Sequence, residues 1–519
     1  MKVEVTFQTA DRVLQKLYNA AEEKEKHNIR YFGDRKVLVE GGGYNNIWLE
    51  TQPMGGGMYA KRDMEAALNN QLLFMEYQKE NGRIPGMIVN RDGVLDPKYD
   101  WFQGFCFPDP AFSLYFWNGE NRDYLLKLYH TLKAIDEYWW TYRDSDHDGC
   151  LETWCICDTG EDNCTRFFDA PGFWGGEEPP TGVAKLPYES MDYMAYSYEA
   201  RKTLAAISAI LDNGEEADWE QKAEAVRKKL REYLWIEDKN ACYDRDCQNE
   251  FMDILLHNNI RVMHHGAFDQ EMADRFIAHH MLNPEEFWTP MPLPSIAVND
   301  AFFRNNEDND WSGQPEGLTY QRAIRAMENY GHYAELTMIG KKLMEAAGEE
   351  GLFTQQYDPF TGRPSTPHKN DYGPTILAIL EYIERFYGVH VDKTELYWGC
   401  LPGGGQSRVY RQQWGEHLYA MVHEGEWNTA YLDGEELFSV SDGVRVVTDR
   451  EGRIGRIAGI DVEAHKVTVR TAQGATASAV IGPNEVFAWR DGALCLEAKI
   501  PFAADEALLK EWRKPLPRQ

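Results

Sequence analysis

Residues 122–143 read RDYLLKLYHTLKAIDEYWWTYR, and residues 191–212 read MDYMAYSYEARKTLAAISAILD. In both stretches apolar side chains recur every three to four positions, which places them on one face of an α-helix. The segment between them, residues 144–189, is rich in Asp, Gly, Pro, Trp and Cys and lacks this period. Loops of this length are uncommon in compact proteins unless they carry function. We therefore predict a helical hairpin whose connecting loop holds functional residues.

The same alternation of amphipathic helix and long loop continues to about residue 390. Helical stretches recur at residues 64–80, 217–235, 269–282, 317–347 and 374–388. Long loops rich in aromatic and acidic residues recur at residues 38–58, 95–112, 283–316 and 351–372. This arrangement predicts a mainly α protein built as a ring of helical hairpins, with the loops meeting at one mouth.

The pattern of apolar and turn-forming residues changes after Gly388. Short β-prone segments separated by turn residues follow, among them RVYRQQWG (408–415), HLYAMVHEG (417–425) and EVFAWRDG (485–492). Such spacing is typical of an antiparallel β domain. We predict a helical domain over residues 1–390 and a β-sandwich-like accessory domain over residues 391–519.

Composition limits the classes of function. The 519 residues are 43% hydrophobic and 13% aromatic, enough for a large core, and carry a formal net charge of −30. An acidic surface repels nucleic acid and anionic lipid, so neither is expected as a partner. The amino-terminal segment lacks the pattern of an export signal, and the nine cysteines are an odd number. We expect a cytoplasmic protein with reduced thiols, whose oligomeric state the sequence leaves open.

Metal-binding patterns are weak. Four cysteines crowd the long loop, but they lack the paired CxxC spacing of structural zinc sites and are read as buried thiols: Cys150, Cys155, Cys157 and Cys164. The pair His264 and His265 shows no metal spacing either, and is read as packing or surface. The segment DSDHDG resembles the first half of a calcium loop, with ligands Asp144, Asp146 and Asp148, although Cys155 stands at the twelfth position. We expect no required cofactor, and calcium is the metal ion for which the sequence offers candidate ligands.

The side chains that could catalyse a reaction are carboxylates in loops rich in aromatic residues. The chain has no phosphate-binding Gly-rich loop and no nucleophile elbow. Sugars present apolar faces to Trp and Tyr and hydroxyl groups to Asp, Glu, Asn and Arg. Cleavage of a glycosidic bond needs two carboxyl groups, one that donates a proton and one that handles water or the anomeric carbon.

Several motifs, in order, resemble those of a known group. They are YNNIWLETQP (44–53), EYQKENGRIPGMI (76–88), YRDSDHDGCLE (142–152), DTGEDNCTRF (158–167), MLNPEEFWTPMPLPSIAVNDAFF (281–303) and YDPFTGRP (357–364). Together they are similar to the six-hairpin glycosidases, especially glycoside hydrolase family 63 and its mannosylglycerate hydrolase branch, with trehalases more distant. The resemblance implies an (α/α)6 toroid and an inverting, exo-acting glycoside hydrolase. Its substrate would be a small α-linked glucosyl or mannosyl disaccharide or glycoside.

The resemblance also implies roles for individual residues. The motif DTGEDNCTRF is similar to the family pattern ESGWDNSPRW, which makes Asp162 the general acid. Burial and neighbouring carboxylates favour the protonated form that an acid needs. Glu50 stands where the family usually has Asp. The residues expected to bind substrate are Trp48, Glu50, Asp158, Asn163, Arg166, Trp311, Gln314, Tyr357 and Asp358.

The second carboxyl group departs from the family pattern. Gln355 stands where the family has the Glu that activates water, and an amide cannot accept a proton. Glu316, at the start of a helix, is the first candidate for a replacement base, followed by Asp371 and Asp358. Alternatively the chain is a Glu-to-Gln variant, an inverting glycoside phosphorylase in which phosphate attacks, or an inactive sugar-binding protein.

Overall fold

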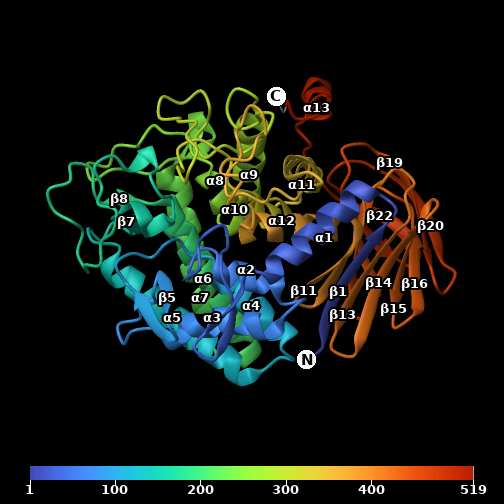
Figure 1. The fold of residues 1–519 in the computed structure, drawn as a ribbon, viewed down its shortest axis with the longest axis horizontal. Helices are drawn as coiled ribbons and strands as arrows, with labels where there is room; N and C mark the ends of the chain where they lie inside the picture. Colours follow the sequence, from blue (N-terminus) through green and yellow to red (C-terminus); the bar gives the residue numbers. More distant parts are fainter. Residues whose placement is uncertain (518–519) are drawn as a thin grey trace.

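The computed structural model describes residues 1–517 and has a helical part and a part made of strands (Figure 1). The predicted helical stretches 122–143 and 191–212 are α5 and α6. The stretch 317–347 forms two helices, α10 and α11, separated by a turn in which Gly331 takes a φ of 73°. The helices are α1 (Arg12–Lys26), α2 (Gln52–Tyr59), α3 (Met64–Glu76), α4 (Pro108–Trp117), α5 (Arg122–Tyr142), α6 (Met191–Leu211), α7 (Glu216–Lys229), α8 (Asn258–His264), α9 (Gln270–Phe276), α10 (Gly317–Glu328), α11 (Tyr333–Ala347), α12 (Gly373–Tyr387) and α13 (Glu506–Trp512).

Short polar side chains cap the N-termini of several of these helices. Asp63 accepts a hydrogen bond from the backbone N–H of Ala66 before α3, and Asn121 accepts one from Tyr124 before α5. Each cap satisfies a backbone donor that has no partner inside the helix, and this stabilises a helix by roughly 1 kcal/mol. The loops therefore end, and the helices begin, at positions encoded locally.

Alternate helices pack side by side along the helical part. Contacts link α2 to α4, α4 to α6, α6 to α8, α8 to α10, α10 to α12 and α12 back to α2. The first turns of three of them meet, because Thr319 Oγ1 of α10 lies 3.1 Å from Nδ1 of His257, just before α8. Gly317 of α10 approaches α12 so closely that a Cβ atom there would lie 1.7 Å from Thr375 Oγ1. These helix starts bring their preceding loops together.

The strands after α12 form two antiparallel sheets, one ordered β1-β13-β14-β15-β16-β19-β20 and the other β11-β12-β17-β18-β21-β22. They face each other through Trp398, which contacts the rings of Tyr419 and Phe438. The strands of this part are β1 (Val3–Thr9), β11 (Val389–Asp392), β12 (Glu395–Cys400), β13 (Arg408–Trp414), β14 (His417–Glu424), β15 (Trp427–Leu432), β16 (Glu435–Val440), β17 (Val444–Asp449), β18 (Ile454–Gly459), β19 (His465–Thr471), β20 (Thr476–Ile481), β21 (Glu485–Arg490) and β22 (Ala493–Lys499).

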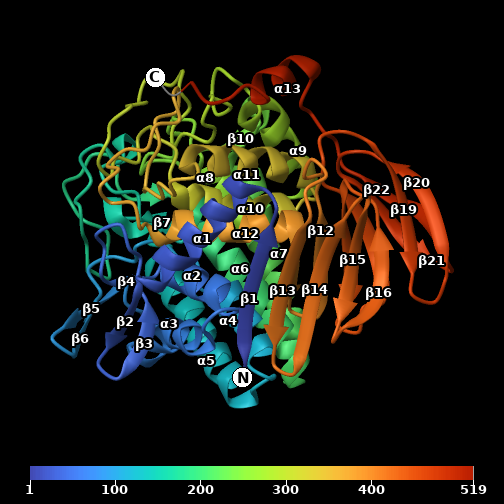
Figure 2. The same cartoon turned by 45° about the vertical axis from the view of Figure 1, so that its right-hand side comes forward.

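The amino-terminal strand belongs to this sheet region and not to the helices around it in sequence. Val3 pairs with Trp414 and Thr9 with Arg408, so β1 lies along β13, blue beside orange in Figure 2. The predicted boundary between residues 390 and 391 falls inside β11. The division into 1–390 and 391–519 stays a prediction, with residues 3–9 pairing across it.

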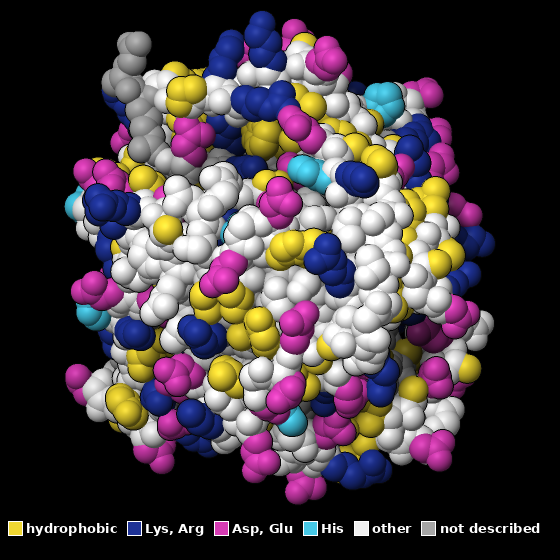
Figure 3. All heavy atoms as spheres, turned by 90° about the vertical axis from the view of Figure 1, so that its right-hand side faces the viewer, with side chains coloured by type: hydrophobic (Ala, Val, Ile, Leu, Met, Phe, Trp, Pro, Cys, Tyr) yellow, Lys and Arg dark blue, Asp and Glu magenta, His cyan; other side chains and the backbone are white. Residues whose placement is uncertain are grey.

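Short strands line the loops of the helical part. They are β2 (Ile29–Phe32), β3 (Arg35–Leu38), β4 (Ile47–Trp48), β5 (Met87–Arg91), β6 (Val94–Lys98), β7 (Glu152–Thr153), β8 (Tyr188–Glu189), β9 (Trp235–Ile236) and β10 (Ala241–Cys242). The face that presents the C-terminal strands mixes Lys and Arg with Asp and Glu, without a stripe of one sign (Figure 3). Within residues 1–517, no helix combines the length and apolar character that crossing a bilayer requires.

Candidate active site

A buried ion pair anchors the loop that holds Asp162. Asp158, in the short 3-10 helix Ile156–Thr159, lies 2.6 Å from Arg143 Nη1 at the end of α5, and neither side chain is exposed. Asp158 also accepts hydrogen bonds from the backbone N–H groups of Trp154 and Phe102. Carboxylates with this many charged and backbone donors hold loop geometry strongly. Asp158 thus anchors the loop in this structure, and its contact with substrate stays a prediction.

Arg166 forms a second buried anchor behind the same loop. Its guanidinium group lies 2.7 Å from Glu161, 2.9 Å from Asp192 and 3.2 Å from Asp244. Arg166 is 1% exposed, so it ties the loop to α6 and does not reach a surface. Its predicted role as a neighbour that shapes the site of Asp162 is compatible with this position, whereas direct substrate contact stays untested.

Asp162 itself is half-buried between two side chains. The thiol of Cys157 donates to Asp162 Oδ1 at 3.3 Å, and the amide of Asn309 donates to Asp162 Oδ2 at 2.9 Å. The backbone oxygen of Asp162 accepts a hydrogen bond from the N–H of Trp311 at 3.2 Å. Gly160, two residues earlier, turns the chain with a φ of 73°. The loop therefore presents the carboxyl group of Asp162 toward Asn309.

Gln355 lies on the other side of the same asparagine. Its Nε2 donates to Asn309 Oδ1 at 2.8 Å, and its Oε1 accepts from the hydroxyl of Tyr44 at 3.0 Å. Asp162 and Gln355 are thus joined through one amide group. The three residues come from three separate loops, and the catalytic roles of Asp162 and of position 355 stay predictions.

Glu50 forms part of the floor beneath these groups. It follows β4, and its Oε2 accepts from Arg322 Nη2 at 3.0 Å while its Oε1 accepts from Gln103 at 3.3 Å. Burial raises the pKa of Glu50 to about 7, although the charges of Arg322 and Arg261 oppose the shift, and Asp162 adds to it. A carboxyl group with this pKa can exchange a proton near neutral pH.

Two further carboxyl groups lie within electrostatic reach of Asp162. Glu316, the N-cap residue of α10, is 0% exposed, and neither of its carboxyl oxygens has a well-aligned hydrogen-bond partner among residues 1–517. Burial raises its pKa well above the usual range, and the charges of Glu50 and Asp162 act in the same direction. Burial also raises the pKa of Glu40, which accepts a hydrogen bond from Tyr372 at 3.0 Å. Because a base must be ionised, this raised pKa opposes that role for Glu316.

Two of the predicted aromatic residues border this cluster. Trp48 is half-buried, its ring lies 6.5 Å from that of Tyr44, and its Nε1 has no hydrogen-bond partner among the described residues. Trp311 is 2% exposed and packs between His257 and Arg261, 5.8 Å and 5.2 Å away. A ring with a free N–H donor suits a sugar hydroxyl.

Other predicted binding residues hold the surrounding loops. Asn163 is exposed and donates to the backbone oxygen of Asn309 at 2.9 Å. Gln314 is 1% exposed and donates to Asn305 at 2.9 Å, and the hydroxyl of Tyr357 donates to the oxygen of Leu352 at 2.7 Å. Their contact with substrate is a prediction that the structure neither supports nor tests.

The two lower-ranked base candidates are also engaged. Asp358 accepts from Asn305 at 2.7 Å and caps the turn that contains Thr361. Its carboxylate is therefore committed to holding the loop. Asp371 accepts from the backbone N–H of Gly42 at 3.1 Å.

Sequence reasoning missed three residues of the cluster: Glu40, Tyr44 and Asn309. Tyr44 lies within the quoted motif YNNIWLETQP, so its place in a functional loop was readable. Asn309 lies in the polar segment EDND (307–310), where Asp308 and Asn309 both take positive φ, 73° and 61°. That strain for residues with a Cβ atom marks functional loops, but it is visible only in the structure.

The predicted calcium ligands converge with two more carboxyl groups. The carboxyl oxygens of Asp144, Asp146 and Asp148 lie within 4.8 Å of one another, and those of Asp146, Glu152 and Glu189 do so too. Glu189 is 3% exposed, and its Oε2 has no hydrogen-bond partner among residues 1–517. Glu152 occupies the ninth position of the loop, a calcium-ligand position that the sequence displays, whereas Glu189 arrives from β8.

The four cysteines of the long loop are buried free thiols. Burial raises the pKa of Cys157, and the carboxylate of Asp162 adds to the shift. A protonated thiol at this place serves as a donor to Asp162.

Comparisons with known proteins agree with this geometry. The family model of the mannosylglycerate hydrolase MGH1-like glycoside hydrolase domain matches residues 58–374. No functionally curated protein matches the sequence. Among solved structures, a glycoside hydrolase family 63 mannosylglycerate hydrolase from Thermus thermophilus, in complex with glucose, aligns with a TM-score of 0.58 at 16% identity, covering 70% of this chain and 99% of that one.

A neutral trehalase from Saccharomyces cerevisiae aligns with a TM-score of 0.52 at 13% identity, covering 70% of this chain and 79% of that one. These likenesses show that this chain shares its fold, over 70% of its length, with two proteins of the six-hairpin glycosidase superfamily. Its C-terminal region of antiparallel sheets is seen in the structure itself. The family model spans more than half of the chain and includes the loop of Asp162. The chain therefore belongs to the MGH1-like glycoside hydrolase family.

Proposed function

We propose that this protein is an inverting, exo-acting glycoside hydrolase that removes a glucosyl or mannosyl residue from a small α-linked glycoside. The bridge of Asn309 between Asp162 and Gln355 carries the proposal. Its two hydrogen bonds of 2.9 and 2.8 Å, with the width of one amide between them, limit the separation of the two side chains to about 8 Å. Inverting glycosidases hold their two carboxyl groups roughly 6.5–9.5 Å apart, which leaves room for a water molecule.

In this proposal Asp162 donates its proton to the glycosidic oxygen as the bond to the anomeric carbon breaks. Water attacks that carbon from the opposite face, on the side of Gln355 and Tyr44, and loses a proton. Trp48 would support the apolar face of the sugar, and Glu50 would accept hydrogen bonds from its hydroxyl groups. A ring of six hairpins, the (α/α)6 toroid, is the fold we propose around this site, and the cycle of contacts from α2 through α12 supports it.

Gln355 affects the step in which the attacking water loses its proton. Its amide can orient water but cannot accept the proton. We propose that Glu316, whose buried carboxyl group lies near the amide of Gln356, accepts it when ionised, although burial disfavours the ionised form. Turnover would then be slow wherever Glu316 is mostly protonated.

The experiment compares Gln355→Glu, Glu316→Gln and the unaltered protein on a panel of α-linked glucosyl and mannosyl disaccharides and glycosides, with NMR of the released anomer. Hydrolysis with inversion that increases in Gln355→Glu and disappears in Glu316→Gln supports the proposal. Release of the retained anomer, or turnover that requires phosphate, contradicts it. The second outcome identifies a phosphorylase.

A sugar-binding protein without turnover is the second candidate, and the identity of residue 355 favours it. In that case a sugar would raise the thermal unfolding temperature of the protein while no glycoside is consumed. Absence of product in both the unaltered protein and Gln355→Glu, with thermal stabilisation retained, would establish this candidate.

We also propose a structural calcium ion at the acidic cluster and a cytoplasmic location. Glu189, buried with an unpartnered oxygen beside four other carboxyl groups, fits an oxygen-binding cation. Asp144, Asp146, Asp148, Glu152 and Glu189 would hold it and thereby fix the turn after α5. The free, mostly buried thiols support a reducing compartment.

A further inference from the structure

A second cluster of metal-binding side chains lies away from Asp162, among α4, α8 and α10. Cys106 precedes α4, and His264 and His265 stand at the end of α8. One ligand atom from each residue lies within 4.8 Å of the others. The three side chains are 1%, 2% and 2% exposed. Both histidines are buried, which agrees with the packing position predicted for them and excludes a surface position.

Each histidine is oriented by a partner on its other ring nitrogen. Nδ1 of His265 lies 2.9 Å from Glu199 Oε2, and Nδ1 of His264 lies 3.1 Å from the backbone oxygen of Arg322. Because both partners can only accept, each Nδ1 carries the proton, and each Nε2 keeps a lone pair. Carboxylate or carbonyl partners on the far nitrogen are the usual outer contacts of metal-binding histidines.

One ring nitrogen of the cluster lacks a well-aligned partner. The thiol of Cys106 lies near both imidazoles, but Nε2 of His265 has no hydrogen-bond partner of ordinary geometry among residues 1–517. An unpaired acceptor at this burial costs roughly 1–3 kcal/mol, so it calls for an explanation. A metal ion would satisfy both nitrogens and the thiolate at once.

We propose that Cys106, His264 and His265 bind a zinc ion. One thiolate and two imidazoles are ligands that zinc prefers, in a site with room for a fourth ligand. Arg322 brings a positive charge near Cys106, but its guanidinium group is paired with Glu50 at 3.0 Å. Glu199 supplies a further negative charge behind His265. The site is therefore not surrounded by net positive charge.

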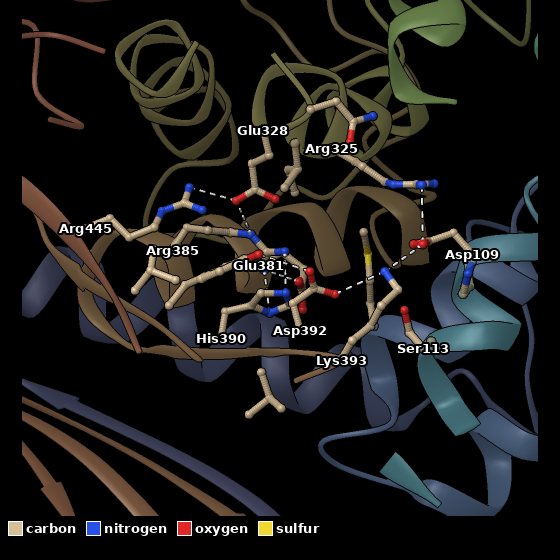
Figure 4. Close-up of a pocket in the computed structure, with 18 of the residues that line it drawn as sticks. Asp109, Ser113, Arg325, Glu328, Glu381, Arg385, His390, Asp392, Lys393 and Arg445 are labelled. Carbon is tan, nitrogen blue, oxygen red and sulfur yellow. Dashed lines mark hydrogen bonds and ion pairs between the residues drawn. The ribbon is translucent and has the colours of Figure 1, made fainter. Parts of the chain in front are cut away.

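A cavity borders the cluster on the side of His264. It has a volume of about 270 Å³ and lies between the helical part and the sheets, with His264 in its wall. Polar side chains of both parts face it, including Asp109, Arg325 and Lys393, which are linked by ion pairs of 3.4 and 2.8 Å (Figure 4). In the proposal, a water molecule on this side would be the fourth ligand.

The site also connects to the floor of the active site. The backbone oxygen of Arg322 accepts from His264, and its guanidinium group holds Glu50. The zinc ion would thus stabilise the segment of α10 that positions Glu50. This role is structural and does not depend on which glycoside the protein cleaves.

Cobalt substitution tests the proposal in the full-length protein. After dialysis against a chelator, one equivalent of Co²⁺ should produce a thiolate-to-cobalt charge-transfer band in the near ultraviolet and the visible bands of a four-coordinate site. Zinc should abolish both, and metal analysis of the protein purified without chelator should find zinc. The acidic cluster around Glu189 has one thiol beside it, that of Cys150, so Cys150→Ala is a further control and should keep the thiolate band.

Variants assign the band to its ligands. Cys106→Ala and His265→Gln should abolish it, whereas Cys400→Ala, buried in β12, and Cys247→Ala, at an exposed thiol, should retain it. No thiolate band in the unaltered protein, or the same band in Cys106→Ala, overturns the proposal. Because the titration of the unaltered protein decides by itself, a variant that fails to fold leaves the test intact.

Discussion

The side chains of Asp162 and Gln355 meet through one amide group, that of Asn309. Asp162 accepts from its nitrogen at 2.9 Å and Gln355 donates to its oxygen at 2.8 Å. In the proposed function the scissile bond lies between Asp162 and Gln355, where Asn309 now lies, so a sugar would have to displace both hydrogen bonds.

Asp162→Asn should lower kcat by roughly 10²–10⁴-fold, because an amide cannot protonate the leaving group. Glycosides with an acidic leaving group need little protonation and should lose much less activity. The measurement is kcat on natural disaccharides and on aryl glycosides or glycosyl fluorides. Asp169→Asn, at an exposed position of the same loop, is the matched control and should behave like the unaltered protein. Equal losses on both substrate classes would contradict the role of Asp162 as acid.

Asn309→Gly should tighten substrate binding by about fivefold for each hydrogen bond that the sugar no longer has to displace, at about 1 kcal/mol per bond. Glycine tolerates the φ of 61° at this position, so the backbone stays unstrained. Isothermal titration with a disaccharide measures the effect, and Asp308→Gly, at the neighbouring positive φ, serves as control. Weaker binding in Asn309→Gly would mean that Asn309 itself contacts the sugar.

The pH dependence of hydrolysis should reveal the base. Burial raises the pKa of Glu316, so activity that depends on ionised Glu316 should increase with pH, at higher pH than an ordinary Glu would require. In Gln355→Glu, a half-buried carboxyl group becomes the base, and the rise in activity should move to lower pH. Rate profiles from about pH 4 to 10 would show this shift. Coincident profiles would exclude Glu316 as the base.

Chelation should destabilise the turn after α5. Removal of calcium with EDTA leaves five carboxyl groups with Lys229, 3.1 Å from Asp148, as a cationic neighbour, so the thermal unfolding temperature should fall and should recover when calcium is added. Glu189→Gln should abolish the response to calcium, and Glu178→Gln, in the same loop but outside the cluster, should keep it. A calcium response that is unchanged in Glu189→Gln would place the ion elsewhere.

His332 should make stability depend on pH. Burial alone would lower its pKa, but Asp274 at 2.9 Å and Glu335 at 3.2 Å outweigh burial and raise the pKa to about 9. A pKa raised in the folded state contributes stability that is complete below the unfolded value of about 6.5 and is lost as pH rises through about 9. The free energy of unfolding should fall by about 3 kcal/mol over that range. Urea unfolding of the unaltered protein and of His332→Gln measures it, and an equal slope in both would assign the pH dependence to other groups.

Local patterns in the sequence determined the helices, their caps and the long loops, because helical periodicity and capping involve residues a few positions apart. The order of motifs, through the family resemblance, also predicted Asp162 as the acid and residue 355 as the position where a carboxylate is missing. The sequence alone shows that residue 355 is an amide, and no tertiary packing can make an amide act as a base.

Tertiary packing alone decided which side chains meet. Val3 pairs with Trp414, Glu189 reaches the acidic turn from another strand, and Asn309 joins Asp162 to Gln355. Each of these contacts links positions far apart in the chain, so no periodicity or spacing encodes them. The pKa of a buried carboxyl such as Glu316 belongs to the same class, since it depends on how completely packing removes water and which charges remain nearby.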